Sequence, residues 1–173
     1  MTRRFGVAAV VVLTVALSSS LAFGEDSVAR EARDRAEIDA LMWRYVRALD
    51  TLNADAYVAV YTPDGQFGSG PTAPKGHDAL KKMIADLKQG QVDREAKSGA
   101  RSAPMYHVIT NPYVEFVDKD HVRYHAYWMT VFGAAGESTP LRVAAAGREY
   151  DELVRVNGRW LIKLRDVAPK DER

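Results

Sequence analysis

The first half of the chain carries apolar residues at helical spacing. Two segments, 27–50 and 77–87, repeat them every three or four residues, which lays them along one side of a helix. A shorter helix is expected between them at 53–61. The apolar side of the first consists of Ile38, Leu41, Tyr45 and Leu49. Asn53 is a residue type that caps helix N-termini, and Pro63-Asp64-Gly65 predicts a stop and a turn after the second helix.

The segments around the third helix lack this periodicity. A short strand around Gln66-Phe67 leads into residues 68–76, whose glycines and prolines predict a loop. Residues 89–103 are polar and have few regularly spaced apolar positions. We expect a mobile loop there, and a candidate lid for a binding site.

The second half of the chain changes to a β pattern. Val, Ile, Tyr, Trp and Phe are enriched in four segments, which are Met105–Val117, Val122–Phe132, Leu141–Val156 and Trp160–Val167. Asp118-Lys119-Asp120 and Asn157-Gly158 predict tight turns, and Asn-Gly is the strongest short signal of a hairpin. Helices followed by a meander of long strands indicate the α+β class. A curved antiparallel sheet around such helices leaves a cavity in which a small molecule can bind.

The N-terminal segment is typical of a secretory signal peptide. Arg3-Arg4 precedes an apolar run at 5–17, and small residues follow. The alternative is an uncleaved membrane anchor, but the run is shorter than the about 20 residues that span a bilayer. We therefore expect residues 1–24 to be removed, with no stable membrane anchor left. Residues 25–173 would then be a single near-neutral domain, exported to the periplasm or secreted.

Composition narrows the function classes. A chain of 173 residues predicts one domain, and its net charge of +1 argues against a nucleic-acid binder. The chain has no cysteine, which excludes disulfides, zinc–thiolate sites, iron–sulfur clusters and a cysteine nucleophile. The lack of cysteine is compatible with an oxidising compartment.

Five short stretches stand in an order and at separations typical of one superfamily. They are Arg35-Ala36-Glu37-Ile38 continuing to Arg47-Ala48-Leu49-Asp50, Tyr61-Thr62-Pro63-Asp64-Gly65, Gly76-His77-Asp78-Ala79-Leu80, His107-Val108-Ile109-Thr110-Asn111 and Asn157-Gly158-Arg159-Trp160. Over residues 33–168 the chain resembles the NTF2-like, SnoaL-like superfamily, nearest the scytalone dehydratase and hexachlorocyclohexane dehydrochlorinase branch. The resemblance implies a cone-shaped α+β fold, with a strongly curved antiparallel sheet wrapped around about three N-terminal helices and an internal pocket.

The resemblance also implies site residues. In that branch the acid that ends the first helix pairs with a strand histidine, and Asp50 and His107 stand at these positions. An arginine five residues after the last-strand tryptophan lines the dehydrochlorinase pocket, which implies Arg165. The chain departs from the branch at Tyr45, where the dehydrochlorinase has a basic residue, and near Phe132, where the dehydratase has a second catalytic histidine. Scytalone dehydration itself is therefore not expected.

A histidine–aspartate pair in an apolar cavity is suited to proton abstraction. Imidazole accepts a proton at neutral pH, and a carboxylate on its other nitrogen fixes the tautomer and stabilises the imidazolium. We assign His107 as base, Asp50 as its orienter and Arg165 as an electrostatic partner for a leaving group or oxyanion. We expect a cofactor-independent lyase, of dehydratase, dehydrochlorinase or aldehyde-lyase type, or an isomerase, acting on a small hydrophobic, aromatic substrate. The alternatives are that Asp50 only ends a helix and that His107 is a core histidine.

Further residues are expected to bind substrate, with ordinary packing as the alternative. They are Tyr45, Tyr61, Tyr106, Asn111, Trp128 and Phe132. Strand alternation turns Arg165 away from the side that Trp160 faces unless a bulge intervenes. Pro112 has no N–H, so it predicts an edge strand or a bulge beside Asn111.

We predict no metal site, because His121 and His125 on one strand are about 13 Å apart at ~3.3 Å per residue. The expected partners are a small hydrophobic molecule and a second or third copy of the chain, joined through Val122–Phe132, and no nucleic acid. Two other functions stay open. One is a non-catalytic ligand-binding or oligomerisation module of the same fold, and the other is a polyketide-cyclase-like enzyme.

Overall fold

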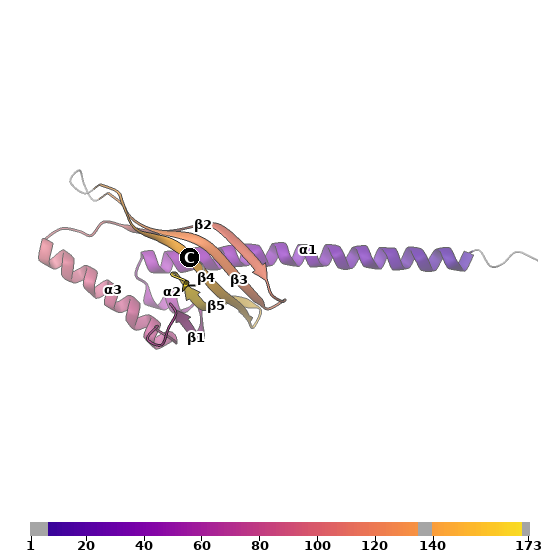
Figure 1. Cartoon of the computed structure of the whole chain (residues 1–173), viewed down its shortest axis with the longest axis horizontal. Helices are drawn as coiled ribbons and strands as arrows, with labels where there is room; N and C mark the ends of the chain where they lie inside the picture. Colours follow the sequence, from indigo (N-terminus) through magenta and orange to yellow (C-terminus); the bar gives the residue numbers. More distant parts are fainter. Residues whose placement is uncertain (1–6, 135–139, 171–173) are drawn as a thin grey trace, which may run out of the picture. The chain divides into compact units, whose positions relative to one another are not determined.

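The computed structural model describes residues 7–134 and 140–170, with side chains from residue 27 on. The chain forms two compact units, residues 1–38 and 39–173. The described part of the first unit is the beginning of helix α1 (Val7–Asp50), drawn in indigo in Figure 1. No helix within the described ranges is both long and apolar enough to cross a bilayer. The predicted signal segment 1–24 begins outside the described residues, and its cleavage stays a prediction.

Three helices contribute to the second unit: α1 from residue 39 onward, α2 (Ala54–Val58) and α3 (His77–Ser98). The predicted apolar side of α1 is buried within this unit at Leu41, Tyr45 and Leu49. Asn53 caps α2 as predicted, because its Oδ1 accepts a hydrogen bond from the backbone N–H of Ala56 at 3.0 Å. α2 is shorter than the predicted helix, and the chain enters a strand where that helix was expected to end.

The predicted mobile loop and lid at 89–103 is wrong for residues 89–98, which continue α3. Polar pairs four residues apart hold the helix there: Gln89 Nε2 donates to Asp93 at 2.7 Å, and Gln91 Nε2 donates to Glu95 at 3.1 Å. A helix stabilised by such pairs needs little apolar periodicity, which is why the hydrophobic pattern did not reveal it. Gly99, with φ of +69°, follows the last helical residue in the left-handed conformation typical of helix ends.

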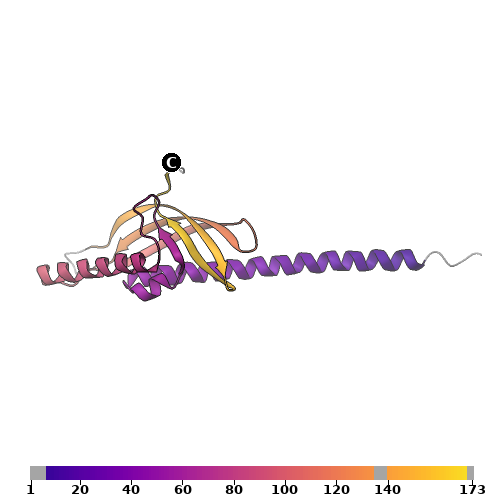
Figure 2. The same ribbon diagram turned by 90° about the horizontal axis from the view of Figure 1, so that it is seen from below.

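Five strands form one open sheet in the order β1-β5-β4-β3-β2. They are β1 (Tyr61–Phe67), β2 (Met105–Phe116), β3 (His121–Phe132), β4 (Arg142–Val156) and β5 (Arg159–Asp166). The four long strands pair antiparallel as predicted, whereas β1 pairs parallel with β5. β1 reaches the sheet from the helices and not through a hairpin, so no tight turn dictates its direction. Figure 2 shows the curved sheet on one side, with α2, α3 and the end of α1 on the other.

Irregularities in strand pairing decide which side chains face the helices. Between Thr110 and Tyr113 the register of β2 against β3 shifts, so the bulge predicted at Pro112 is confirmed, on an edge strand. In β5, Ile162 pairs with Leu153 and Leu164 with Glu152, which leaves Lys163 as an extra residue. Each extra residue inverts the alternation of side chains beyond it.

The predicted Asn157-Gly158 turn joins β4 to β5, and both residues have positive φ, as a type I′ hairpin turn requires. The turn predicted at Pro63-Asp64-Gly65 is wrong, because these residues lie within β1. They produce an irregular segment in the strand, since the β1–β5 register shifts between Tyr61 and Gln66.

Gly65 allows this irregular segment to lie against β5. A Cβ atom built on Gly65 would be 3.0 Å from the carbonyl oxygens of Ile162 and Thr62. We therefore expect Gly65→Ala to lower the free energy of unfolding by about 1–3 kcal/mol, the usual cost of overpacking. Gly90→Ala is the matched control, because Gly90 lies within helix α3, where alanine stabilises by about 0.5–1 kcal/mol. Urea denaturation measures both, and equal stability of Gly65→Ala and the wild type would contradict the close approach.

Candidate active site

Asp50 and His107 form a hydrogen-bonded pair. Asp50 is the last residue of α1, and His107 lies near the start of β2. The Oδ1 atom of Asp50 lies 2.9 Å from Nδ1 of His107 and 2.8 Å from the backbone nitrogen of the same residue. The side chains are 7% and 17% exposed. The last turn of a helix disfavours a negative charge, so helix termination does not account for the position of this carboxylate, whereas the bonds to His107 do.

The hydrogen bonds define which nitrogen of His107 is available. An ionised carboxylate only accepts hydrogen bonds, so Nδ1 of His107 carries the proton that it donates to Asp50. In this tautomer Nε2 is a proton acceptor, and it has no hydrogen-bond partner among the described residues. The guanidinium of Arg47 approaches the other carboxylate oxygen of Asp50 at 3.9 Å. The hydrogen bond thus fixes the orientation of the imidazole and leaves Nε2 without a partner among the described residues.

Both members of the pair line a pocket of about 390 Å³ between the helices and the sheet. Most of its wall is apolar and comes from six elements, the connection between α1 and α2, and the segment before β2. It includes Leu49, Met83, Leu87, Met105 and Phe132. The polar lining residues are Asp50, Gln91, Arg94, Ser102 and His107. This size and composition are those of a small-molecule site, with apolar walls and a few polar groups that fix orientation.

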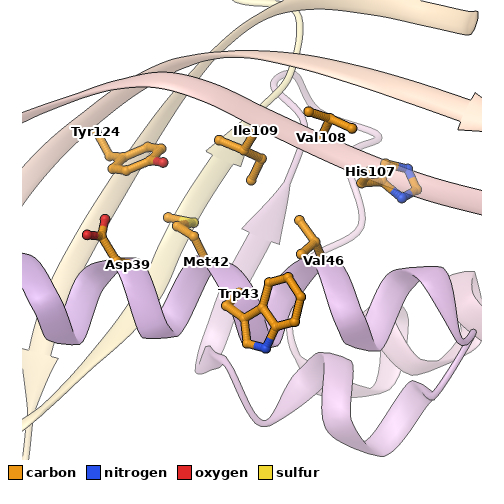
Figure 3. A pocket seen from close by; sticks show the side chains of 8 residues that line it. All are labelled: Asp39, Met42, Trp43, Val46, His107, Val108, Ile109 and Tyr124. Carbon is orange, nitrogen blue, oxygen red and sulfur yellow. The ribbon is translucent and has the colours of Figure 1, made fainter.

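His107 also lines a second pocket of about 390 Å³, between α1 and the edge of the sheet. Figure 3 shows Met42, Val46 and Trp43 along α1 beneath Ile109 and His107 of β2. The Trp43 side chain is 66% exposed, so this second pocket is a surface groove and not an enclosed cavity. His107 therefore stands in the wall between a groove at the sheet edge and the pocket that Asp50 lines.

Arg165 faces the helices, because the extra residue Lys163 inverts the strand alternation, but it does not line either pocket that contains His107. It is fully packed in the core. Its Nη2 donates to Glu149 at 2.5 Å and its Nη1 to Asp151 at 2.5 Å, and its guanidinium lies 4.0 Å from the ring centroid of Tyr45. Arg165 is therefore paired with two buried carboxyl groups, and it is not among the residues that line the pocket of Asp50 and His107.

This buried cluster holds more acid than base. Burial raises the pKa of the Asp151 carboxyl well above its usual value, although Arg165 lowers it, and burial likewise raises the pKa of Glu149. Within the described part of the chain, one oxygen of each carboxyl and the Nε atom of Arg165 have no hydrogen-bond partner. One cation facing two buried carboxyls favours a proton on one of them.

Of the six predicted substrate-binding residues, Phe132 lines the pocket with the His107–Asp50 pair. Tyr45 and Tyr61 are buried core residues, each packed against the ring of Tyr57. Burial raises the pKa of both hydroxyls, which therefore stay protonated at neutral pH. The lining of that pocket includes neither of them.

The other three lie elsewhere. Tyr106 is 46% exposed and points away from the side that His107 faces, as its neighbour on a strand must. Asn111 is exposed in the β2 bulge, with φ of +52°. Trp128 packs its ring over Gly147 and donates from Nε1 to the carbonyl oxygen of Val167 at 2.9 Å. None of the three lines the pocket that Asp50 and His107 share.

Sequence reasoning missed the contribution of α3. Gln91 and Arg94 reach the pocket wall from the half of α3 that was interpreted as a loop. The signal that indicates this helix is the set of polar pairs at four-residue spacing, which place Gln91 and Glu95 on one side of it.

A second histidine–aspartate pair lies exposed at the surface. His121 Nδ1 lies 2.8 Å from Asp118 in the turn before β3, where the histidine side chain is 58% exposed. Neither residue lines a pocket that contains His107. In the part of the chain that the structure describes, no group of three or more His, Cys, Asp and Glu side chains is arranged to hold a metal ion.

Several solved structures are similar in fold to this chain. An NTF2-like protein with a cystatin-like fold from Novosphingobium aromaticivorans superposes with a TM-score of 0.67 at 21% identity, covering 86% of this chain and 89% of that one. A protein from the same organism named "Putative Scytalone Dehydratase" gives 0.64 at 18% identity, with 84% and 99% covered. A cystatin-like protein of unknown function from Nostoc punctiforme gives 0.63 at 21% identity, with 82% and 94% covered. At these identities the likeness concerns the fold.

No curated protein matches the chain. The family model described as "SnoaL-like domain" matches residues 30–166, which include every residue of the second unit that forms the helices, the sheet and the pocket described above. The predicted cone is thus confirmed as the NTF2-like, cystatin-like fold, with an open five-stranded sheet. The chain belongs to the SnoaL-like domain family, which includes isomerases, dehydratases and cyclases.

Proposed function

We propose that the protein is a lyase or isomerase that removes a proton from a small hydrophobic substrate without a cofactor. The observation that carries the proposal is the hydrogen bond between Asp50 and Nδ1 of His107 in the wall of an apolar pocket. It leaves Nε2 as a base, and a positioned base contributes typically ~10²–10⁴ to a rate. Two comparisons support this class of chemistry: the family membership, and the similar solved structure that is named "Putative Scytalone Dehydratase".

In the proposed reaction, His107 Nε2 takes a proton from a carbon next to an electron-withdrawing group. The electron pair of the broken C–H bond forms a double bond. In an elimination, a halide leaves as an anion, or a hydroxyl leaves as water after it receives the proton from the imidazolium. In an isomerisation, the imidazolium returns the proton to another carbon of the substrate. When a halide leaves, the imidazolium passes its proton to solvent. In each case Asp50 stabilises the imidazolium, which carries a positive charge only until that proton is passed on.

The test is turnover of a panel of aromatic alcohols, aromatic halides and β-hydroxy ketones, followed by NMR in deuterated water. We expect elimination or hydrogen–deuterium exchange with the wild type and its loss in His107→Gln, with unchanged circular dichroism. His121→Gln is the matched control, because that residue forms the same kind of pair with Asp118 but lies exposed in a turn. Equal turnover by His107→Gln and the wild type would remove the base assignment. If the protein binds members of the panel but turns none of them over, the non-catalytic module would be favoured.

Export and self-association complete the proposal. We propose that residues 1–24 direct export and are removed, which mass spectrometry of the mature chain tests. We propose that the protein forms a dimer or trimer, since the outward side of the sheet exposes Tyr106, Tyr113 and Tyr127. A monomer in analytical ultracentrifugation at micromolar concentration would contradict the second proposal.

A further inference from the structure

One cationic side chain, which has no partner among the described residues, lines the pocket that Asp50 and His107 share. Arg94, on α3, lines this pocket and forms no hydrogen bond or ion pair with any residue that the structure describes. The acids beside it in the sequence have other partners, because Asp93 accepts from Gln89 and Glu95 accepts from Gln91 and from the backbone of Ser102. A guanidinium binds carboxylates and similar oxyanions strongly, because it donates parallel hydrogen bonds.

The guanidinium of Arg94 lies toward the preceding helical turn. A Cβ atom built on Gly90 would lie 3.4 Å from its Nη1 atom, so the side chain lies back along α3 over a residue without a side chain. Long side chains on helices lean in this direction.

Two of the polar residues that line the pocket come from different elements. His107 belongs to β2 and Arg94 to α3, and apolar side chains, Met83, Leu87 and Met105 among them, make up most of the remaining wall. The carboxylate of Asp50 is engaged by His107. A ligand whose chemistry matches this lining has an apolar body and one anionic oxygen group, and its reactive carbon lies next to His107.

We infer that Arg94 is a specificity residue, and that the substrate is an apolar molecule carrying a carboxylate or a similar anionic oxygen group. The inference rests on the proposed function in taking the pocket's ligand to be its substrate. Arg94 is solvent-exposed, so salt screens its charge. It therefore acts on binding in the ground state more than on a charge that develops during the reaction.

The experiment compares two fluorescent probes with the same apolar rings, anilinonaphthalene sulfonate, which is an anion, and N-phenylnaphthylamine, which is neutral. We expect the wild type to bind the anion more tightly. In Arg94→Gln we expect the Kd of the anion to rise about tenfold, as for the loss of one charge-assisted hydrogen bond, and the Kd of the neutral probe to stay unchanged. Added salt should weaken only the anion in the wild type.

Arg101→Gln is the matched control, because Arg101 is an exposed arginine near the end of α3 that does not line the pocket. Met83→Trp reduces the pocket volume and should weaken both probes. Equal affinity of the wild type for the two probes, or the same loss in Arg101→Gln as in Arg94→Gln, would overturn the inference. Undiminished binding of the anion by Met83→Trp would also overturn it, since the anion would then lie outside the pocket.

The measurement involves no turnover, so it is independent of the base assignment. His107→Gln should keep the preference for the anion if Arg94 confers it. An inactive wild type that still prefers the anion would remove the proposed catalysis and leave the binding site. An active wild type without the preference for the anion would leave the proposed catalysis and remove the inferred role of Arg94.

Discussion

Asp50→Ala is expected to lower kcat for the substrate found with the panel by about 10²–10⁴, as much as the loss of the base itself. Without the carboxylate, Nδ1 of His107 loses its partner at 2.9 Å, and the imidazolium that forms on proton transfer loses its counter-charge. The double variant Asp50→Ala/His107→Gln should be no slower than either single variant, because residues that act as one unit are not additive. Multiplied losses in the double variant would show that the two residues act independently.

Asp50→Asn should have a smaller effect for a geometric reason. The same carboxylate oxygen accepts both hydrogen bonds from His107, so an asparagine that keeps an oxygen in this position retains both. Its NH₂ group then faces the Arg47 guanidinium, which lies 3.9 Å from the second oxygen. We expect the tautomer to persist and the loss to be about 10²-fold, since only the charge that stabilises the imidazolium is removed. Nitrogen-15 NMR of the ring reports the tautomer directly, and a proton on Nε2 in Asp50→Asn would contradict this account.

Arg165→Met is expected to lower the free energy of unfolding at neutral pH by about 3–5 kcal/mol, because it leaves buried carboxyls without a cation. Glu149 and Asp151 are both fully buried and both bond to this guanidinium. Arg123→Met is the matched control, since Arg123 pairs with Glu115 at the surface and such pairs contribute about 0–1 kcal/mol. Urea denaturation measures both variants, and equal losses would contradict a special role for the buried cluster.

The pH dependence of this loss has a defined sign. The folded-state pKa values of Glu149 and Asp151 are raised by burial, and removing Arg165 takes away the interaction that lowers them. Because the folded-state pKa values of the two carboxyls lie above their unfolded-state values, their contribution to stability is complete when the pH is below the unfolded-state pKa. The contribution is lost as the pH rises through the folded-state pKa values. The deficit of Arg165→Met should therefore be smaller at about pH 4, near the ordinary carboxyl pKa, than at about pH 7.5. In the triple variant Arg165→Met/Glu149→Gln/Asp151→Asn, the loss of unfolding free energy should be nearly independent of pH. A loss in Arg165→Met that becomes smaller as the pH rises would contradict the role given to the two carboxyls.

The sequence by itself determined the α+β class, the long strands and the hairpin at Asn157-Gly158, because periodicity and turn chemistry are local properties of the chain. It missed the second half of α3, where polar pairs and not an apolar side hold the helix. It also placed a turn at Pro63-Asp64-Gly65, where pairing with β5 turns the same residues into an irregular strand.

For the candidate site, the sequence supplied Asp50 and His107 through their positions in a family pattern, and the tertiary structure brought them within hydrogen-bond distance. Only the tertiary structure decided where Arg165 lies and which cationic side chain lines the pocket. One extra residue at Lys163 inverts the strand alternation and buries Arg165 between two carboxylates, while the length of α3 brings Arg94 to the pocket. The bulge at Lys163 depends on how β5 pairs with β4, a distant segment, and the apolar spacing of β5 does not encode it.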